Sequence, residues 1–144
     1  MKNVNMITRR LKTVKVADLV PYAGNPRHNN KSAKIVAKSI EQYGYINPII
    51  VTENNIILAG HTRTKALKIL GIEEIEVLEV VGLSEAQIHG FVIADNRVGE
   101  YSQWNYSGID RMMSNVSKED ALLKELGMSS FVDNKKDLED LING

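Results

Sequence analysis

The stretch LAGHTRTKALKILG, residues 58–71, joins an apolar run to a helical pattern through a single glycine. The apolar residues before Gly60 predict a short strand, and the pattern after it predicts a helix that ends at Gly71. A strand that turns directly into a helix leaves the first N–H groups of the helix without an acceptor. Together with the helix dipole, these groups attract anions.

The side chains at this corner suit a phosphate group. Arg63 offers a planar fork of donors, and His61, Thr62 and Thr64 add further donors. Gly60 lets a ligand approach the main chain closely. A second interpretation stays open, in which Gly60 only permits a tight turn, Thr62 caps the helix and the basic side chains are solvated.

Upstream of this corner, the sequence predicts a strand, a helix and a hairpin. The strand is expected from Thr13 and is followed by a loop rich in Gly, Pro and Asn. The helix is expected between an N-cap at Ser32 and a C-terminal glycine at Gly44. Two β-rich runs, 47–51 and 55–59, then have the spacing of a hairpin.

Downstream, residues 75–81 predict a strand with Glu76 and Glu79 facing water. Ser84 begins a capping box that opens a longer helix, and weaker helical patterns follow at 109–116 and 118–126. We therefore expect an α/β domain extended by a helical C-terminal portion.

Asp95 is an unusual residue for its predicted place. It falls on the helical stripe that should face the core, which is formed by Ile88, Phe91, Val92 and Val98. A buried carboxylate is costly unless it is paired or binds a cation. Two interpretations stay open: a salt bridge to Arg63 or Arg27, or a ligand for Mg²⁺ at the same site as Gly60.

The charges of the chain are divided unevenly between its halves. Residues 1–72 contain 12 Lys and Arg against 3 Asp and Glu, a balance of +9, whereas residues 73–144 contain 6 against 15, a balance of −9. Such a division indicates a front that faces a polyanion. Attraction between helix faces within one fold is the alternative.

Composition excludes several classes of protein. The chain has 144 residues, 43% of them hydrophobic and none of them cysteine, so it holds no disulfide and no thiolate site. It has no apolar run of about 18 residues and no apolar segment after its basic start. We therefore expect no membrane span, no signal peptide and a cytoplasmic setting.

Four motifs in order resemble the ParB/sulfiredoxin superfamily. They are NPR at 25–27, YGYINPIIV at 43–51, AGHTR at 59–63 and IADNR at 93–97. The resemblance is strongest to ParB-like nuclease-type domains of phages, mobile elements and DNA methyltransferase fusions. It implies a small mixed sheet packed by helices at 13–103, with a basic arm at 1–12 and a helical extension at 104–144.

The resemblance also implies site residues. Gly60 and Arg63 match the corner that holds nucleotide phosphates, with His61, Thr62 and Thr64 beside them. The family's Glu-Asn pair, which helps to place Mg²⁺ and phosphates, is matched by Asp95 and Asn96. Asn47 matches a residue near the base or sugar, and Arg27 matches the arginine of an N-terminal turn.

These residues imply a module that binds CTP or ATP with Mg²⁺ and acts on or near DNA. A DNA methyltransferase, another phage or mobile-element protein, or a second copy of the chain are further candidate partners. Two alternatives stay open: a metal-dependent DNase or phosphoryl-transfer enzyme with Asp95 and His61 as catalytic residues, or an interaction module without a ligand. The chain lacks a methylase motif, which argues against base methylation, and the absence of cysteine excludes sulfinic acid reduction.

Overall fold

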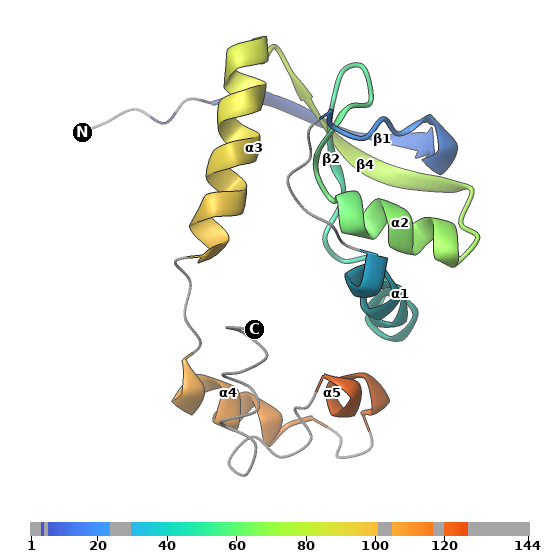
Figure 1. Cartoon of the computed structure of the whole chain (residues 1–144), viewed down its shortest axis with the longest axis vertical. Helices are drawn as coiled ribbons and strands as arrows, with labels where there is room; N and C mark the ends of the chain where they lie inside the picture. The colour runs from blue at the N-terminus through green and yellow to red at the C-terminus, as the bar shows by residue number, and fades with distance from the viewer. Residues whose placement is uncertain (1–3, 5, 24–29, 101–104, 117–119, 127–144) are drawn as a thin grey trace. The chain divides into compact units, whose positions relative to one another are not determined.

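The computed structural model describes residues 4, 6–23, 30–100, 105–116 and 120–126 (Figure 1). The chain divides into two compact units, residues 1–100 and 101–144. Within the described residues, no helix is long and apolar enough to cross a membrane.

The first unit is built on a mixed four-stranded sheet in the order β1-β4-β2-β3. Its strands are β1 (Thr8–Lys15), β2 (Ile50–Thr52), β3 (Ile57–Ala59) and β4 (Glu74–Val81). The outer pairs β1–β4 and β2–β3 are antiparallel, while the central pair β2–β4 is parallel. The predicted α/β class with a small mixed sheet is therefore confirmed.

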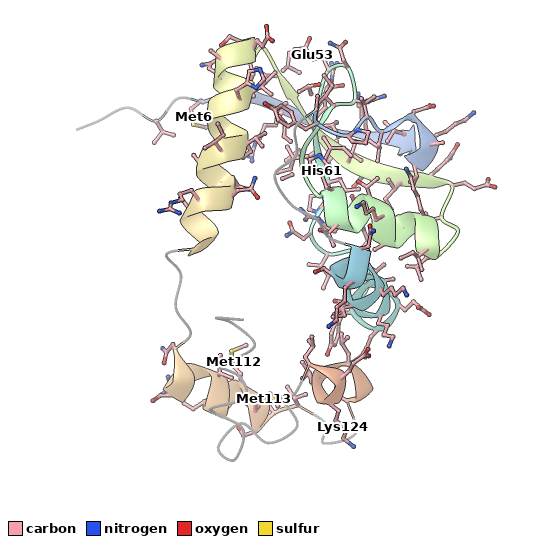
Figure 2. All side chains as sticks on the ribbon, in the orientation of Figure 1. Met6, Glu53, His61, Met112, Met113 and Lys124 are labelled. Atoms are coloured by element: carbon pink, nitrogen blue, oxygen red, sulfur yellow. The ribbon has the colours of Figure 1, made fainter. Side chains whose placement is uncertain are left out.

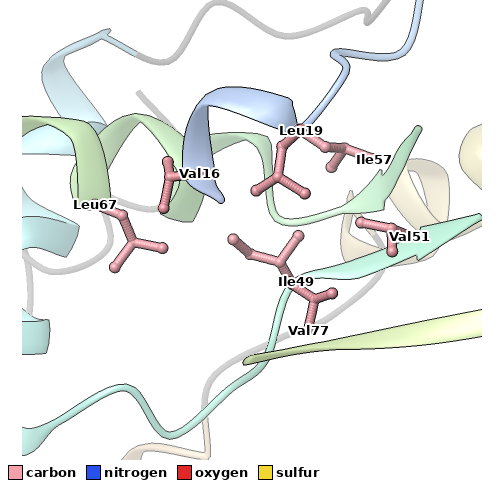
Figure 3. Packing of buried hydrophobic residues seen from close by; sticks show 7 residues of the cluster. All are labelled: Val16, Leu19, Ile49, Val51, Ile57, Leu67 and Val77. Carbon is pink, nitrogen blue, oxygen red and sulfur yellow. The ribbon is translucent and has the colours of Figure 1, made fainter. Parts of the chain in front are cut away.

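Helices cover both faces of this sheet. A short 3-10 helix η1 (Val16–Asp18) follows β1, and the α-helices are α1 (Asn30–Tyr43), α2 (His61–Ile69) and α3 (Glu85–Glu100). Helices α1 and α2 pack against each other (Figure 1). The main core lies on their side of the sheet and is formed by Val16, Leu19, Ile49, Val51, Ile57, Leu67 and Val77 (Figure 3).

A second, smaller cluster attaches α3 to the opposite face. It consists of Leu58, Val80 and Val92. Leu58 directly follows the core residue Ile57 in β3, and successive side chains of a strand point to opposite faces. Each layer of helices therefore has its own set of apolar contacts.

Most of the predicted elements are present, with local signals that explain them. Gly44 has a φ of +95° and ends α1, and its N–H donates to the carbonyl of Ile40 at 2.9 Å. The predicted hairpin is formed by β2 and β3. The capping box is confirmed, because Ser84 N–H donates to Gln87 Oε1 at 2.9 Å and Gln87 N–H donates to Ser84 Oγ at 3.2 Å.

Two predicted boundaries are wrong. The first strand begins at Thr8 rather than Thr13, because its paired length is set by β4, with Thr8 opposite Val81. The first long helix begins at Asn30, so Ser32 lies inside it and is not its N-cap.

The predicted exposure of Glu79 is also wrong. Its side chain is only 3% exposed and pairs with Arg10 and Lys12 of β1. Glu76 and Glu79 are three residues apart in one strand, so they point to opposite faces and cannot share one environment. The pKa of Glu79 is lowered, chiefly by its hydrogen bond from Lys12.

The helical stripe predicted to bury Asp95 is buried only in part. Val92 is buried, whereas Phe91 is 41% and Val98 63% exposed, and Asp95 is exposed as well. Helix α3 is about 24 Å long, while β3, the strand that it contacts, spans only about 10 Å. The ends of the helix therefore extend past the surface that would bury them.

The second unit contains α4 (Tyr106–Met113) and α5 (Ala121–Glu125), which correspond to the two weaker helical patterns. Ile109 and Leu122 are buried. Asp120 caps α5, since its Oδ1 accepts from Leu123 N–H at 3.0 Å. The stretch KKDLEDLING at 135–144, which has the pattern of a short amphipathic helix or a frayed tail, lies outside the described residues.

Candidate functional site

The first unit contains an open cavity of about 640 Å³ at the start of α2. It is lined by parts of α1 and α3, by the segment before β2, and by the corner between β3 and α2. A volume of this size lies within the range of about 300–1,000 Å³ that is usual for small-molecule sites.

Gly60 forms the corner of this cavity. Its φ is +111° and its ψ +26°, in the left-handed region. A Cβ at this position would lie 3.0 Å from Ile49 Cγ1 and 3.2 Å from Arg63 Nε. The first helical bond runs from Thr64 N–H to the Gly60 carbonyl, so the amides of residues 61–63 precede the hydrogen-bond ladder of the helix.

Arg63 folds back over this corner. Its Nη1 donates to the main-chain carbonyl of Asn47 at 3.1 Å. Burial lowers the pKa of Arg63, while Tyr45 and then Asp95 act in the opposite direction. The guanidinium nevertheless stays charged at neutral pH. The cavity thus has a partly desolvated cation at the start of a helix.

Asp95 and Asn96 of α3 line the same cavity as Gly60 and Arg63. The predicted convergence of two sequence regions about thirty residues apart is therefore confirmed as geometry. Asn96 Nδ2 donates to the Val92 carbonyl at 2.7 Å within the helix. The predicted Mg²⁺ and nucleotide roles of Asp95 and Asn96 stay predictions.

His61, the first residue of α2, is labelled in Figure 2 and also lines the cavity. Its Nε2 accepts a hydrogen bond from Tyr22 N–H at 3.0 Å. Burial, followed by the charge of Lys65, lowers the pKa of His61. The imidazole is therefore kept neutral, with its acceptor nitrogen already in use.

The other predicted site residues fall into three groups. Asn47 and Thr62 line the cavity. Thr64 does not, because its side chain is buried and its hydroxyl donates to the Gly60 carbonyl at 2.8 Å. Thr64 thus stabilises the first turn of α2, and its role in ligand binding stays a prediction. Arg27 lies outside the described residues.

Sequence reasoning missed the wall that α1 contributes. Ser32, Val36, Ser39 and Tyr43 line the cavity at helical spacings of three and four residues, a signal that the sequence contains. Tyr45 also lines it, and its hydroxyl joins two segments by accepting from Ile49 N–H and donating to the Glu76 carbonyl, both at 2.8 Å. Burial raises the pKa of Tyr45.

The cavity could bind a metal ion only if a bound ligand supplied some of the metal's ligands. No group of three or more His, Cys, Asp or Glu side chains able to hold a metal occurs among the residues that the structure describes. Mg²⁺ is often held by one or two carboxylates plus substrate phosphates. Asp95, which lines the same cavity as Gly60 and Arg63, fits that arrangement.

Comparison with known proteins agrees with this architecture. A family model described as the ParB N-terminal domain matches residues 2–97. The Escherichia coli ParB-like nuclease domain-containing protein YnaK is 35% identical over 71 residues, which are 49% of this chain and 82% of that relative. A probable chromosome-partitioning protein ParB of Campylobacter jejuni is 30% identical over 88 residues, 58% of this chain and 31% of the relative.

Solved structures share the fold at low identity. A pNOB8-like ParB-N domain has a TM-score of 0.54 at 18% identity, over 92% of this chain but only 52% of its own length. A C-terminally truncated chromosome-partitioning protein ParB of Caulobacter crescentus, solved with CTP-γ-S, has a TM-score of 0.61 at 17% identity, over 77% of this chain and 68% of that one. The match to the family model covers most of the chain, and the chain therefore belongs to the ParB N-terminal domain family.

Proposed function

We propose that the first unit binds a nucleoside triphosphate with Mg²⁺ in the cavity and acts in a DNA-associated process. The observation that carries the proposal is that Gly60, Arg63 and Asp95 line one cavity at the start of a helix. CTP is the first candidate, because a neighbour in structure was solved with CTP-γ-S, and ATP is the second.

The residues present fit the phosphates. The absence of a side chain at Gly60 leaves the main chain open where a Cβ would crowd Ile49 and Arg63. Main-chain N–H groups at the start of a helix and a guanidinium are both strong partners for phosphate oxygens. In this proposal the amides of residues 61–63 and Arg63 hold the phosphates.

The remaining lining residues fit a metal and a nucleoside. Asp95 would share Mg²⁺ with the phosphates, which supplies neutralising charge when bound. Asn96 would assist through its side-chain oxygen. Asn47 would contact the base or sugar, and the hydrogen bond from Arg63 to its main-chain carbonyl would keep this segment beside the phosphates.

The contacts in the cavity favour binding over cleavage. The name of the Escherichia coli relative refers to a nuclease domain. In this chain, Asp95 is the only carboxylate among the described residues that line the cavity, and the acceptor nitrogen of His61 is occupied. Neither residue is therefore arranged as a ready general base beside a metal cluster.

A basic surface supports the association with DNA. Helices α1 and α2 carry exposed lysines at positions 31, 34, 38, 65 and 68, against the single acidic residue Glu41. Lys31, Lys34 and Lys68 make no ion pair within the part of the chain that the structure describes. Such a surface attracts a phosphate backbone without sequence preference, and this attraction weakens as the salt concentration rises.

Other features of the proposal come from the sequence alone. A homodimer, a DNA methyltransferase or another phage or mobile-element protein as partner, and a cytoplasmic setting, stay predictions.

A thermal-shift panel tests the nucleotide site. CTP, ATP, GTP and UTP are added with and without Mg²⁺ to the wild type, Arg63→Ala and Lys68→Ala. A ligand at 100 times its Kd adds about 2.7 kcal/mol to the free energy of unfolding, so the wild type should melt at a clearly higher temperature. Arg63→Ala should lose this rise.

Lys68→Ala is the matched control, since it removes one positive charge from the same helix but does not line the cavity. It should keep the rise in melting temperature. A wild type that responds to no nucleotide would contradict the proposal, and so would an equal response from Arg63→Ala.

A further inference from the structure

Tyr22 connects two helices that are far apart in the sequence. Its main-chain N–H donates to His61 Nε2 of α2 at 3.0 Å, and its hydroxyl is hydrogen-bonded to His89 Nδ1 of α3. The Tyr22 and His89 rings also meet edge to face, with centroids 5.5 Å apart and planes at 70°. At the other side of its ring, His89 Nε2 lies 3.5 Å from Glu85 Oε1.

The bond from Tyr22 determines which nitrogen of His61 carries the proton. Nε2 must keep its lone pair to accept this bond, so the proton of the neutral imidazole is on Nδ1. Among the described residues, Nδ1 has no hydrogen-bond acceptor. His61 lines the cavity, two residues before Arg63. His61 is therefore suited to donate an uncharged N–H to a bound ligand.

The hydrogen bond between the Tyr22 hydroxyl and His89 helps to fix the position of α3. This helix is attached to the sheet through Val92, and Tyr22 packs against the same small cluster. His89 precedes Asp95 by six residues, about 9 Å along the helix. A contact that holds His89 therefore also helps to hold Asp95 at the cavity.

We propose that Tyr22 is a positioning residue for the cavity. It holds His61 as a neutral Nδ1–H donor for an anionic oxygen of the ligand, and through His89 it holds α3 so that Asp95 faces the site. The identity of the ligand rests on the proposed nucleotide function, whereas the state of His61 does not. The task of His61 is then to donate a hydrogen bond and not to abstract a proton.

The first experiment uses the full chain without nucleotide. Nitrogen-15 NMR at about pH 7.5 should show His61 with an unprotonated Nε2 and a protonated Nδ1. Hydrogen exchange at the Tyr22 amide should be slow in the wild type and fast in His61→Ala. It should be slow again in His61→Gln, whose Oε1 can accept the same bond. A proton on Nε2, or equal exchange in all three proteins, would overturn the proposal.

The second experiment measures the Kd of CTP with Mg²⁺ by calorimetry for Tyr22→Phe, His89→Phe and the double variant. Each single change should weaken binding by about 2- to 10-fold, the effect of one neutral hydrogen bond. The double variant should be no weaker than the weaker single one, because both changes remove the same bond. Singles that bind like the wild type, or effects that multiply, would overturn the role of Tyr22 in holding α3.

The two experiments separate the two proposals. A wild type that binds none of the four nucleotides with Mg²⁺ refutes the nucleotide function and, with it, the part of this proposal that concerns the ligand. The NMR result decides the arrangement of Tyr22 and His61 in either case.

Discussion

Replacement of Gly60 by alanine tests the corner on which the site is built. The residue has a φ of +111°, and a left-handed conformation costs a non-glycine residue about 1–2 kcal/mol. The new Cβ would also lie 3.0 Å from Cγ1 and 3.2 Å from Cα of Ile49. Ile49 is fully buried, with 0% exposure, and crowding in a packed core costs about 1–3 kcal/mol. We expect Gly60→Ala to lower the free energy of unfolding by roughly 3 kcal/mol.

Gly71→Ala is the matched control at the other end of the same helix. Gly71 has a φ of +71°, but a Cβ there would meet no atom within 4 Å. Only the conformational cost of about 1 kcal/mol then applies. With about 4–8 °C per kcal/mol for a domain of this size, the two variants should differ in Tm by roughly 10 °C.

The assay is urea and thermal unfolding of both variants, followed by the nucleotide panel. Gly60→Ala should also lose the response to nucleotide, because its Cβ would lie 3.2 Å from Arg63 Nε. Equal stability of the two alanine variants would refute the argument from crowding. Retention of the nucleotide response by a folded Gly60→Ala protein would refute the close approach of the ligand.

Three further predictions concern charge. Asp95→Asn should remove the Mg²⁺ dependence of nucleotide binding, measured by calorimetry with and without the metal, and an unchanged dependence would move the metal elsewhere. Because the pKa of His61 is lowered from 6.5, the unfolded state binds its proton first as pH falls below about 6.5, so the stability contributed by neutral His61 is present above that pH and is lost below it. The melting temperature should therefore fall less steeply from pH 7.5 to 5.5 in His61→Gln than in the wild type, and parallel curves would contradict this sign. Lys34→Gln should reduce the slope of log K against log salt for duplex DNA by about 1, whereas Lys124→Gln, in the acidic half, should leave it unchanged; equal effects of the two would argue against the α1–α2 surface.

Local patterns in the sequence predicted the elements near the site well. Helix α1 has apolar residues at helical spacing and ends at a glycine. The corner before α2 has a glycine where the main chain adopts a positive φ. These signals depend on neighbours within a few positions. They could therefore be interpreted without knowledge of the tertiary contacts.

The errors occur where distant residues decide the environment. The burial of Glu79 depends on Arg10 and Lys12, which are 69 and 67 residues away. The length of the first strand depends on its pairing with β4 and not on its own β propensity. The exposure of Asp95 depends on how little sheet lies under α3. The hydrophobic periodicity of the sequence does not report these tertiary contacts.

The contacts of Tyr22 belong to the same class. His61 and His89 follow Tyr22 in the chain by 39 and 67 residues. No rule of sequence spacing predicts contacts at these separations. The resemblance predicted that Arg63 and Asp95 lie at one site. The hydrogen bonds from Tyr22 to His61 and His89 could be identified only in the structure.

Strand β1 has a consequence for behaviour at high concentration. It lies at the edge of the sheet, and the described residues provide no strand on its outer side. An open edge of eight residues is a template for aggregation. Arg9, Arg10, Lys12 and Lys15 place positive charge along it, so two such edges repel each other when they approach, most strongly at low salt. The residues that complete the sheet thus also discourage molecules from adding to it.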